Sequence, residues 1–196
     1  GKRFKDLDIL RDLPELGRAI RVLETLTYPD GESMMIHDTY GRLVSAGFPP
    51  PSETKPMIYP AFGHGVLGRG DVQDRNQVQA HLHYSGNWGH DHADMLNFVL
   101  WSCNHELISD IGYAHTYRLF ASNTSGHNTV VVDRSPQGRD LARPGDLIAW
   151  HPVSGGVQVI EVSGESAYSQ CETYRRTLML LPVDQDDALV LDIFDV

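Results

Sequence analysis

Histidines and carboxylates of the kind that bind metal ions are concentrated in the middle of the chain. Six of the ten histidines lie between positions 81 and 115, and a seventh is His127. The densest stretch, residues 89–94, reads Gly-His-Asp-His-Ala-Asp. In an extended segment alternate side chains point to the same side, so His90 and His92 can converge on one site. Two imidazoles and one carboxylate, with a position left for water, are a good ligand set for Zn²⁺.

Two later segments offer further ligands. Asp110 lies in the segment 109–113 and His127 in the segment 125–129. Each residue also has a plainer interpretation, because His-x-His is common by chance and a single carboxylate often ends a turn or strand. On spacing alone, metal binding and a structural role therefore both stay open. We interpret the other histidines of this region as hydrogen-bonded structural residues, namely His81, His83, His105 and His115.

The first part of the chain is predicted to be an amphipathic helix. Its apolar residues recur at three- and four-residue steps between charged ones: Leu13, Leu16, Ile20, Leu23 and Leu26. Such a helix packs on a neighbouring element, and turn residues at 28–31 end it. A proline-rich loop at 48–56 then marks the natural domain boundary.

Beyond this loop the hydrophobic period changes to two. Several short segments are rich in β-branched and aromatic residues and are separated by Gly, Pro, Asn and Asp. They are Gln77–Tyr84, Leu96–Trp101, Thr129–Asp133, Val157–Val162, Thr177–Leu181 and Ala188–Val196. The predicted fold class is mainly β, an antiparallel β-sandwich preceded by a short helical segment.

Composition and charge exclude some functions. The chain has 196 residues, 41% hydrophobic and 21% charged, and no apolar run approaches the length of a membrane span. Its net charge of −10, from 26 acidic and 16 basic residues, argues against a broad nucleic-acid-binding surface. The same charge weighs mildly against a polyanionic partner, although a locally positive cleft is compatible with it.

The ends of the chain and its two cysteines indicate less about function. No secretory signal opens the chain, which begins without Met and ends inside a predicted strand. We therefore expect a fragment, or a processed piece, of a longer protein. Cys103 and Cys171 could form a disulfide or remain thiols, and their wide separation without a CxxC pattern slightly favours free thiols.

Three blocks of the sequence resemble a known family. Residues 90–100 read HDHADMLNFVL, residues 107–113 read LISDIGY, and residues 125–133 read SGHNTVVVD. In this order they closely resemble the heparinase II/III-like polysaccharide lyases, whose pattern is roughly GHxHxDxLxF, a hydrophobic strand closing in D-x-G, and HNTVVVD. The flanking residues 65–67 and 174–176 fit as well, so the resemblance extends over nearly the whole chain.

The resemblance implies a domain layout. That family pairs an N-terminal (α/α) toroid with a C-terminal antiparallel β-sandwich. Residues 1–45 would be the end of the toroid and its exit, residues 46–60 a linker, and residues 61–196 a sandwich that is incomplete at its C-terminus. The resemblance also implies a periplasmic or secreted location.

The resemblance further implies roles for single residues. His92, Asp110 and His127 match the three ligands of a Zn²⁺ ion that is mainly structural, with water completing its shell. His90 matches a cleft histidine that approaches the sugar carboxylate or helps proton transfer. Asp94 is expected to hold the loop or to orient a histidine, unless it is a solvated loop acid.

The implied reaction is β-elimination on an acidic, uronic-acid-containing polysaccharide. Tyr113 and Tyr117 lie where the family can place a substrate-contacting, catalytic tyrosine, and Arg118 could grip a carboxylate. Their plainer interpretations are packed aromatic residues and a surface arginine. The principal catalytic tyrosine of the family lies on the toroid, upstream of residue 1, so we expect this chain alone to be inactive.

Two other interpretations compete. A cupin-like metal sandwich also begins with His-x-His, but it expects a glutamate soon after, whereas position 96 is leucine and the next glutamate is Glu106. A non-catalytic, metal-stabilised carbohydrate-binding or structural module is the alternative that stays open. Exposed aromatic residues along one sheet face would favour the binding module, whereas a cleft facing the toroid would favour the lyase.

Overall fold

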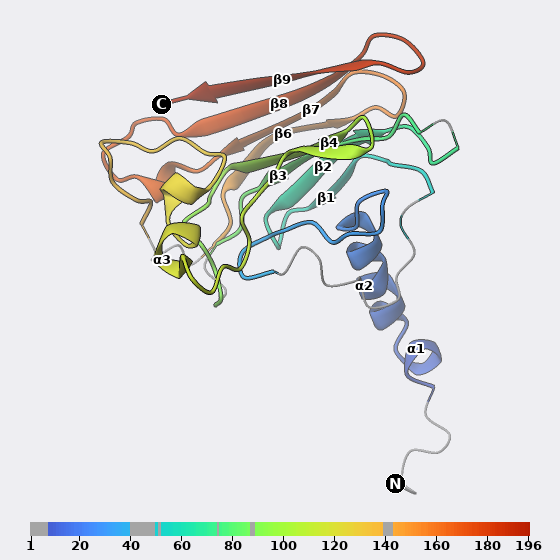
Figure 1. Ribbon diagram of the computed structural model, residues 1–196, viewed down its shortest axis with the longest axis horizontal. Helices are drawn as coiled ribbons and strands as arrows, with labels where there is room; N and C mark the ends of the chain where they lie inside the picture. Colours follow the sequence, from blue (N-terminus) through green and yellow to red (C-terminus); the bar gives the residue numbers. More distant parts are fainter. Residues whose placement is uncertain (1–7, 40–49, 51, 74, 87–88, 139–142) are drawn as a thin grey trace, which may run out of the picture.

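Two antiparallel β-sheets packed face to face make up most of the structure, a computed structural model (Figure 1). This confirms the predicted mainly β sandwich with a short helical segment in front. The structure describes residues 8–39, 50, 52–73, 75–86, 89–138 and 143–196. The side chains at positions 10, 20 and 21, and positions 48, 49 and 51 of the predicted loop at 48–56, lie outside the described part.

Each sheet is a meander in which neighbouring strands follow one another along the chain. The first has the order β1 (Met57–Tyr59), β2 (His64–Arg69), β3 (Val78–His83), β4 (Asn97–Ser102) and β5 (His105–Ile108). The second has the order β6 (Asp146–Pro152), β7 (Gln158–Ser163), β8 (Arg175–Pro182) and β9 (Ala188–Asp195). All the pairings are antiparallel, so no crossover is needed. Two connections are long: β3–β4 carries His90 and His92, and β7–β8 contains a short 3₁₀ turn.

The helices lie at the edges of the sandwich. α1 (Ile9–Asp12) begins after Asp8, whose carboxylate accepts a hydrogen bond from the Arg11 N–H. α2 (Pro14–Thr25) contains the middle of the predicted apolar repeat, and Leu13 and Leu26 flank it as caps. Proline suits the first position of α2 because an N–H there would lack a partner within the helix. The other helical pieces are α3 (Arg118–Ala121) and the 3₁₀ turns η2 (Thr124–Gly126) and η3 (Glu165–Ala167).

The hydrophobic core lies between the two sheets. Alternate residues of β3 point into it, namely Val78, Ala80 and Leu82, as the two-residue period of a strand requires. The second sheet faces them with Ile160, Val162, Leu178 and Leu180. Burying an aliphatic side chain of this size contributes roughly 1.5–3 kcal/mol, so this layer fixes the register of both sheets.

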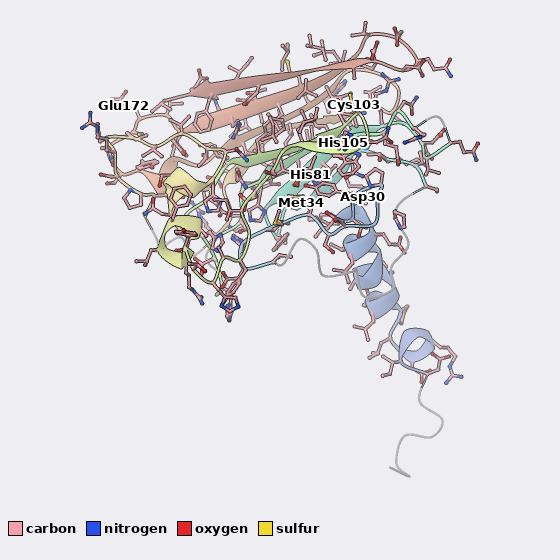
Figure 2. The ribbon with its side chains drawn as sticks, in the orientation of Figure 1. Asp30, Met34, His81, Cys103, His105 and Glu172 are labelled. Atoms are coloured by element: carbon pink, nitrogen blue, oxygen red, sulfur yellow. The ribbon has the colours of Figure 1, made fainter. Side chains whose placement is uncertain are left out.

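The opposite face of the first sheet is also buried, although much of it is polar. Its register pairs His64 with His83 and Val66 with His81, so the histidines share this face. The segment 27–39 crosses it, and in Figure 2 His81 lies on the side of the sheet facing Met34. Tyr28, Met34 and Ile36 of that segment pack with Val99 and Trp101 in a second, smaller core.

One predicted strand is wrong. Five of the predicted segments correspond to β3, β4, β7, β8 and β9, but Thr129–Asp133 contains only an isolated bridge between Val132 and Ser135. Side chains satisfy the carbonyl groups here: Tyr174 Oη donates to Val130 O at 2.6 Å, and Arg176 donates to Asn128 O. Side-chain hydrogen bonds therefore fix the backbone of this segment, where a neighbouring strand would do so in a sheet.

Cys103 is exposed, Cys171 is partly buried, and both are free thiols. β1 lies within the range predicted to be a linker, residues 46–60. In the described part of the chain, no helix is long and apolar enough to cross a membrane.

Candidate metal centre and cleft

Asp110 lies two residues after β5 and is buried with three hydrogen-bond donors around its carboxylate. Oδ1 accepts from the Gly112 N–H at 2.9 Å, and Oδ2 accepts from Asn97 Nδ2 at 2.8 Å. His127 Nδ1 lies 2.7 Å from the same Oδ2. Burial would raise the pKa of Asp110, but these partners outweigh it and the pKa is lowered. The carboxylate is therefore ionised and able to bind a cation.

Gly112 lets the chain turn sharply behind Asp110. Its φ of +59° lies in the left-handed region, and a Cβ built there would lie 2.5 Å from the Thr39 carbonyl oxygen. Only glycine fits both the conformation and the close approach. The Asp-x-Gly pattern of the sequence thus lets the chain directly after Asp110 lie against Thr39, whose carbonyl oxygen accepts from the Tyr113 N–H at 3.2 Å.

His127 follows directly after η2. Asn123 caps this turn by accepting from the Ser125 N–H at 3.3 Å, and the His127 N–H donates to Thr124 O at 3.2 Å. The imidazole is buried, and its ring lies 5.1 Å from the ring of His92. Burial would lower the pKa of His127, but the Asp110 carboxylate outweighs it and raises this pKa.

His92 completes the group predicted from the sequence. Its side chain is 2% exposed, and Nε2 lies 3.1 Å from Asp38 Oδ1. His92, Asp110 and His127 each offer one ligand atom, and these atoms all lie within 4.8 Å of one another. Three segments that are far apart in the sequence therefore bring the expected side chains together.

Unpartnered atoms show that this group suits a metal ion. If His92 Nε2 donates to Asp38 and His127 Nδ1 donates to Asp110, each ring keeps a lone pair on its other nitrogen. In the part of the chain that the structure describes, these two atoms, His92 Nδ1 and His127 Nε2, are buried without a hydrogen-bond partner. Metal-binding imidazoles commonly donate their second N–H to a carboxylate, as both rings can here. The donor set of two imidazoles and one carboxylate fits zinc.

A polar hollow lies beside this group. It is lined by Asp38, His90, Asp91, His92, Arg118 and Ser122. His90 is 84% exposed at its side chain and Arg118 is 56% exposed, so both can reach a molecule in the hollow. Two predicted cleft residues therefore lie next to a predicted metal ligand.

His90 and His92 meet for a different reason from the one predicted. The segment is not an extended strand, because His90 has a φ of +54° and follows Gly89 with a φ of +89°. Both rings nevertheless contact one carboxylate: His90 Nδ1 lies 3.0 Å from Asp38 Oδ2, and His92 Nε2 lies 3.1 Å from Asp38 Oδ1. A shared partner brings them together in place of strand alternation.

Asp38 is the residue that sequence reasoning missed. Besides the two histidines it contacts Arg118, whose Nη2 lies 3.2 Å from Oδ2. Burial would raise the pKa of Asp38, but His90, His92 and Arg118 outweigh it and the pKa is lowered. The only sequence signal was the adjacent pair His37-Asp38, which lies more than 50 residues before His90 and outside the resembling blocks.

Asp94 lies beside a histidine, as one of its predicted roles requires. Its carboxylate is 2% exposed, and Oδ2 lies 3.3 Å from His37 Nδ1 in an ion-pair contact without hydrogen-bond geometry. Burial would lower the pKa of His37, but Asp94 outweighs it and raises this pKa. The histidine that Asp94 contacts was not among the residues predicted.

The two candidate tyrosines differ in exposure. Tyr117 precedes α3 and is 71% exposed. Tyr113 is partly buried, and the Arg118 guanidinium carbon lies 5.4 Å from the centre of its ring. Tyr113 therefore packs against Arg118 of the hollow, whereas the ring of Tyr117, the residue before Arg118, is exposed to solvent.

Comparison with known proteins identifies the family. The family model described as "Heparinase II/III-like, C-terminal" matches residues 73–196, which is more than half of the chain. The chain therefore belongs to the heparinase II/III-like family and contains its C-terminal β-sandwich domain. Among curated proteins, no significant match is found.

Solved structures with the same fold include proteins named heparinase III and heparan sulfate lyase. A heparinase III gene product is 16% identical with a TM-score of 0.71, over 93% of this chain and 32% of that one. The heparan sulfate lyase HepC of Pedobacter heparinus is 15% identical with a TM-score of 0.71, over 92% of this chain and 32% of its own. The chain thus spans about a third of the length of these structures, and at such identities the likeness shows the fold.

Proposed function

We propose that this chain forms the sandwich side of the cleft of a polysaccharide lyase that cleaves uronic-acid-containing glycans by β-elimination. The observation that carries the proposal is the polar hollow, in which exposed His90 and Arg118 lie next to His92 of the candidate metal centre. Membership of the heparinase II/III-like family and the heparan-degrading activity named for its structural neighbours support it.

The reaction requires three tasks at the sugar. The C5 proton is poorly acidic because the neighbouring carboxylate is negative, so that charge must be neutralised first. A base then removes the proton, and an acid protonates the departing C4 oxygen. In the hollow, Arg118 and His90 are suited to contacting the carboxylate. Asp38 holds both of them and takes no proton itself, because its pKa is lowered.

The proton transfers need groups beyond those gathered in the hollow. A tyrosine hydroxyl suits the acid role, and a tyrosine with a lowered pKa or a histidine near neutrality suits the base role. His90 and Tyr117 are the exposed candidates on this chain, and Tyr113 is placed to support Arg118. We expect the principal catalytic tyrosine on the helical part of a longer protein, so this chain alone would show no lyase activity.

The metal centre is proposed to be structural. A zinc ion held by His92, Asp110 and His127 would tie together the loop before β4, the end of β5 and the turn after η2. When bound, zinc supplies positive charge that satisfies two buried imidazole lone pairs and one buried carboxylate. The expected substrate is an acidic polysaccharide or oligosaccharide, and the expected location is periplasmic or secreted.

The metal claim is tested by metal analysis of purified protein and of two variants. We expect one zinc per chain in the wild type and its loss in His92→Ala and in Asp110→Ala, because each substitution removes one of three protein ligands. His151→Ala, a change of an exposed histidine on β6, is the control and should keep the metal. Stoichiometric zinc retained in both ligand variants would contradict the centre.

The lyase claim is tested in the protein joined to its upstream helical region. We expect the ultraviolet absorbance of an unsaturated uronate to rise when the protein is mixed with heparan sulfate or alginate. The competing carbohydrate-binding module would bind these glycans without that rise. In the described strands β6–β9, the large apolar side chains that are exposed are all aliphatic. The exposed aromatic residues Tyr117 and Phe120 lie instead at α3, which also carries Arg118 of the hollow. This distribution favours a cleft over a sheet-face binding site.

A further inference from the structure

Three buried histidines and the partly buried His37 form an unbroken series of hydrogen-bonding contacts beneath the loop that carries His90 and His92. We call His37, His83, His64 and His81, in this order, the histidine chain. His37 Nε2 lies 3.0 Å from His83 Nε2. His83 Nδ1 lies 3.2 Å from His64 Nδ1, and His64 Nε2 lies 3.2 Å from His81 Nδ1. Both nitrogens of every ring are used, so the rings form one polar row across the outer face of the first sheet.

The two ends of the histidine chain have different partners. At one end, His81 Nε2 lies 3.1 Å from the Gln79 side-chain oxygen, and Gln79 Nε2 donates to Thr54 Oγ1 at 3.3 Å. At the other end, His37 Nδ1 accepts from the backbone N–H of His92 at 3.2 Å. The row therefore links the segment before β1, through the sheet, to the backbone of a candidate metal ligand.

The three sheet histidines are uncharged. Burial lowers the pKa of His64 to about 3, and it lowers those of His81 and His83 well below the ordinary value. A neutral imidazole has one N–H donor and one acceptor nitrogen. Each contact in the row therefore fixes which nitrogen carries the proton in the next ring.

The partner at the Gln79 end determines the direction in which hydrogen bonds are donated along the histidine chain. The Gln79 oxygen can only accept, so His81 carries its proton on Nε2 and accepts at Nδ1. His64 then donates from Nε2 and accepts at Nδ1, which makes His83 donate from Nδ1. His83 Nε2 accepts in turn, either from His37 Nε2 or from the hydroxyl of Ser85, which lies 3.0 Å from His83 Nε2 and 2.8 Å from His37 Nε2.

We propose that the histidine chain is a one-directional hydrogen-bond row that positions His37, and through it the backbone of His92, beneath the cleft. His83 is then an Nδ1–H tautomer, whereas His64 and His81 are Nε2–H tautomers. His37 donates from Nε2 whether or not its Nδ1 is protonated, so the direction of the row does not depend on its charge, whereas the hydrogen bond from the His92 N–H requires an unprotonated Nδ1. The positioning of His92 rests on the proposed metal centre, but the tautomer pattern does not.

Two other functions of this cluster are less well supported by the contacts. His37, His83 and Asp94 offer ligand atoms within 4.8 Å of one another, as a second metal site would require. However, each ring nitrogen of His37 and His83 already has a partner, unlike the unpartnered nitrogens of His92 and His127. A proton relay would need a proton-accepting group at each end, and the row ends at the amide of Gln79.

The tautomer pattern is tested by long-range ¹H–¹⁵N correlation spectra of the chain labelled at histidine. Single replacements, His64→Gln, His81→Gln and His83→Gln, assign the rings. We expect His83 to be protonated on Nδ1, and His64 and His81 on Nε2, all uncharged at neutral pH. The reverse pattern, with His83 on Nε2 and the other two on Nδ1, would overturn the proposed direction. A charged ring among these three would overturn it as well.

The positioning role is tested by zinc affinity in a matched pair at position 83. His83→Leu removes both hydrogen bonds, whereas His83→Gln keeps an acceptor and a donor in a side chain of similar length. We expect His83→Leu to weaken zinc binding by about 10–100-fold, the usual effect of losing a residue that supports a ligand. His83→Gln should restore most of the affinity, and His151→Ala on β6 should leave it unchanged.

The outcomes separate the two proposals. If wild-type protein binds no zinc but shows the expected tautomers, the metal centre fails and the hydrogen-bond row stands. If His83→Leu and His83→Gln bind zinc as tightly as the wild type, the positioning role is wrong. Two metals per chain, with one lost in His83→Leu, would replace the row by a second metal site. If His83→Leu does not fold, the wild-type tautomers still decide the direction of the row, and His37→Leu and His37→Gln, which remove and keep an acceptor for the His92 N–H, decide the positioning role by the same comparison of zinc affinities.

Discussion

Asp38 and His90 hold each other through two contacts at the rim of the candidate cleft. The Asp38 N–H donates to His90 O at 3.3 Å, and His90 Nδ1 lies 3.0 Å from Asp38 Oδ2. These contacts keep His90 in the left-handed conformation, which costs a non-glycine residue roughly 1 kcal/mol or more. Because the same carboxylate also contacts His92 and Arg118, Asp38 joins the cleft to the candidate metal centre.

Removing the charge of Asp38 should weaken metal binding. Asp38→Asn keeps the shape of the side chain but replaces one carboxylate oxygen by an NH₂ group, which cannot accept from an N–H. Since Asp38 orients His92 through Nε2, we expect zinc affinity to fall by about 10-fold or more, as for other residues that support a metal ligand. Competition with a coloured chelator measures it, and Asp146→Asn, an exposed change on β6, is the control. Equal affinity in the two variants would contradict this role.

Zinc should raise the temperature of unfolding. An ion that binds only the folded chain stabilises it by about 2.7 kcal/mol when its concentration is 100 times the Kd. For a chain of this size, 1 kcal/mol shifts the midpoint by about 2–4 °C, so we expect a rise of roughly 5–11 °C. Calorimetry with and without a chelator measures the shift. His127→Ala should unfold at the same temperature under both conditions, and a zinc-dependent shift in that variant would place the ion elsewhere.

The fold was predictable from the sequence where local pattern and burial agree. β3 alternates apolar and polar residues and β8 alternates buried and partly buried ones, and period two identifies such strands. β2 was not predicted as a strand because it contains two glycines. Gly65 faces Ile160 so closely that a Cβ would lie 2.3 Å from Cδ1, and Gly68 faces Thr54 in the same way. These glycines reflect packing between distant segments, which a local pattern does not reveal.

The site was predictable only in part. The three metal-centre residues stood in recognisable blocks of sequence, and the structure brings them together. Asp38 and His37 act through residues more than 45 positions away, so nothing near them in the sequence indicated their roles. The histidine chain was equally hidden, because it depends on the register that pairs His64 with His83 and on the segment that covers them.

Replacing Gly112 should destabilise the protein through a steric clash behind Asp110. Gly112→Ala adds a methyl group 2.5 Å from the Thr39 carbonyl oxygen at a φ of +59°. Gly155→Ala is the matched control, since its φ is +72° and nothing lies within 4 Å of the added Cβ. We expect Gly155→Ala to cost about 1 kcal/mol, the left-handed conformation alone, and Gly112→Ala to cost at least about 1 kcal/mol more. Urea unfolding measures the loss of stability in both variants. Equal losses would show that Thr39 moves away from the added methyl group at no cost in free energy.

Arg176 should be essential for anchoring the segment that carries His127. Its guanidinium donates to Leu96 O at 2.6 Å and to Asn128 O, and it pairs with Asp192 at 2.8 and 2.6 Å. Arg176→Met fills the space between Phe98 and Phe194 but leaves Leu96 O without its donor, while Asn128 O keeps the hydrogen bond from the Phe98 N–H at 3.3 Å. We expect a loss of roughly 1–3 kcal/mol in urea unfolding, the cost of an unsatisfied carbonyl.

A neighbouring arginine provides the control for this change. Arg175 also lies on β8, but its side chain is 40% exposed and its partners, Glu161 and Asp195, are partly or largely exposed. Exposed ion pairs contribute little, so Arg175→Met should leave the unfolding midpoint nearly unchanged. If both variants unfolded at the same urea concentration, the anchoring role of Arg176 would be wrong.

Arg118 should act in substrate binding, and its loss should change KM more than kcat. Its guanidinium is held by Asp38 and by the Tyr113 ring, yet more than half of the side chain is exposed to the hollow. Arg118→Gln removes the charge from the hollow, so a substrate carboxylate loses one charge-assisted hydrogen bond. In the lyase that includes the upstream region, we expect KM for the uronate glycan to rise roughly tenfold with a similar kcat, the pattern of lost uniform binding. Arg134→Gln, at an exposed position outside the residues that line the hollow, is the control. A fall in kcat with unchanged KM would instead make Arg118 a residue of the transition state, acting on the charge that develops as the C5 proton leaves.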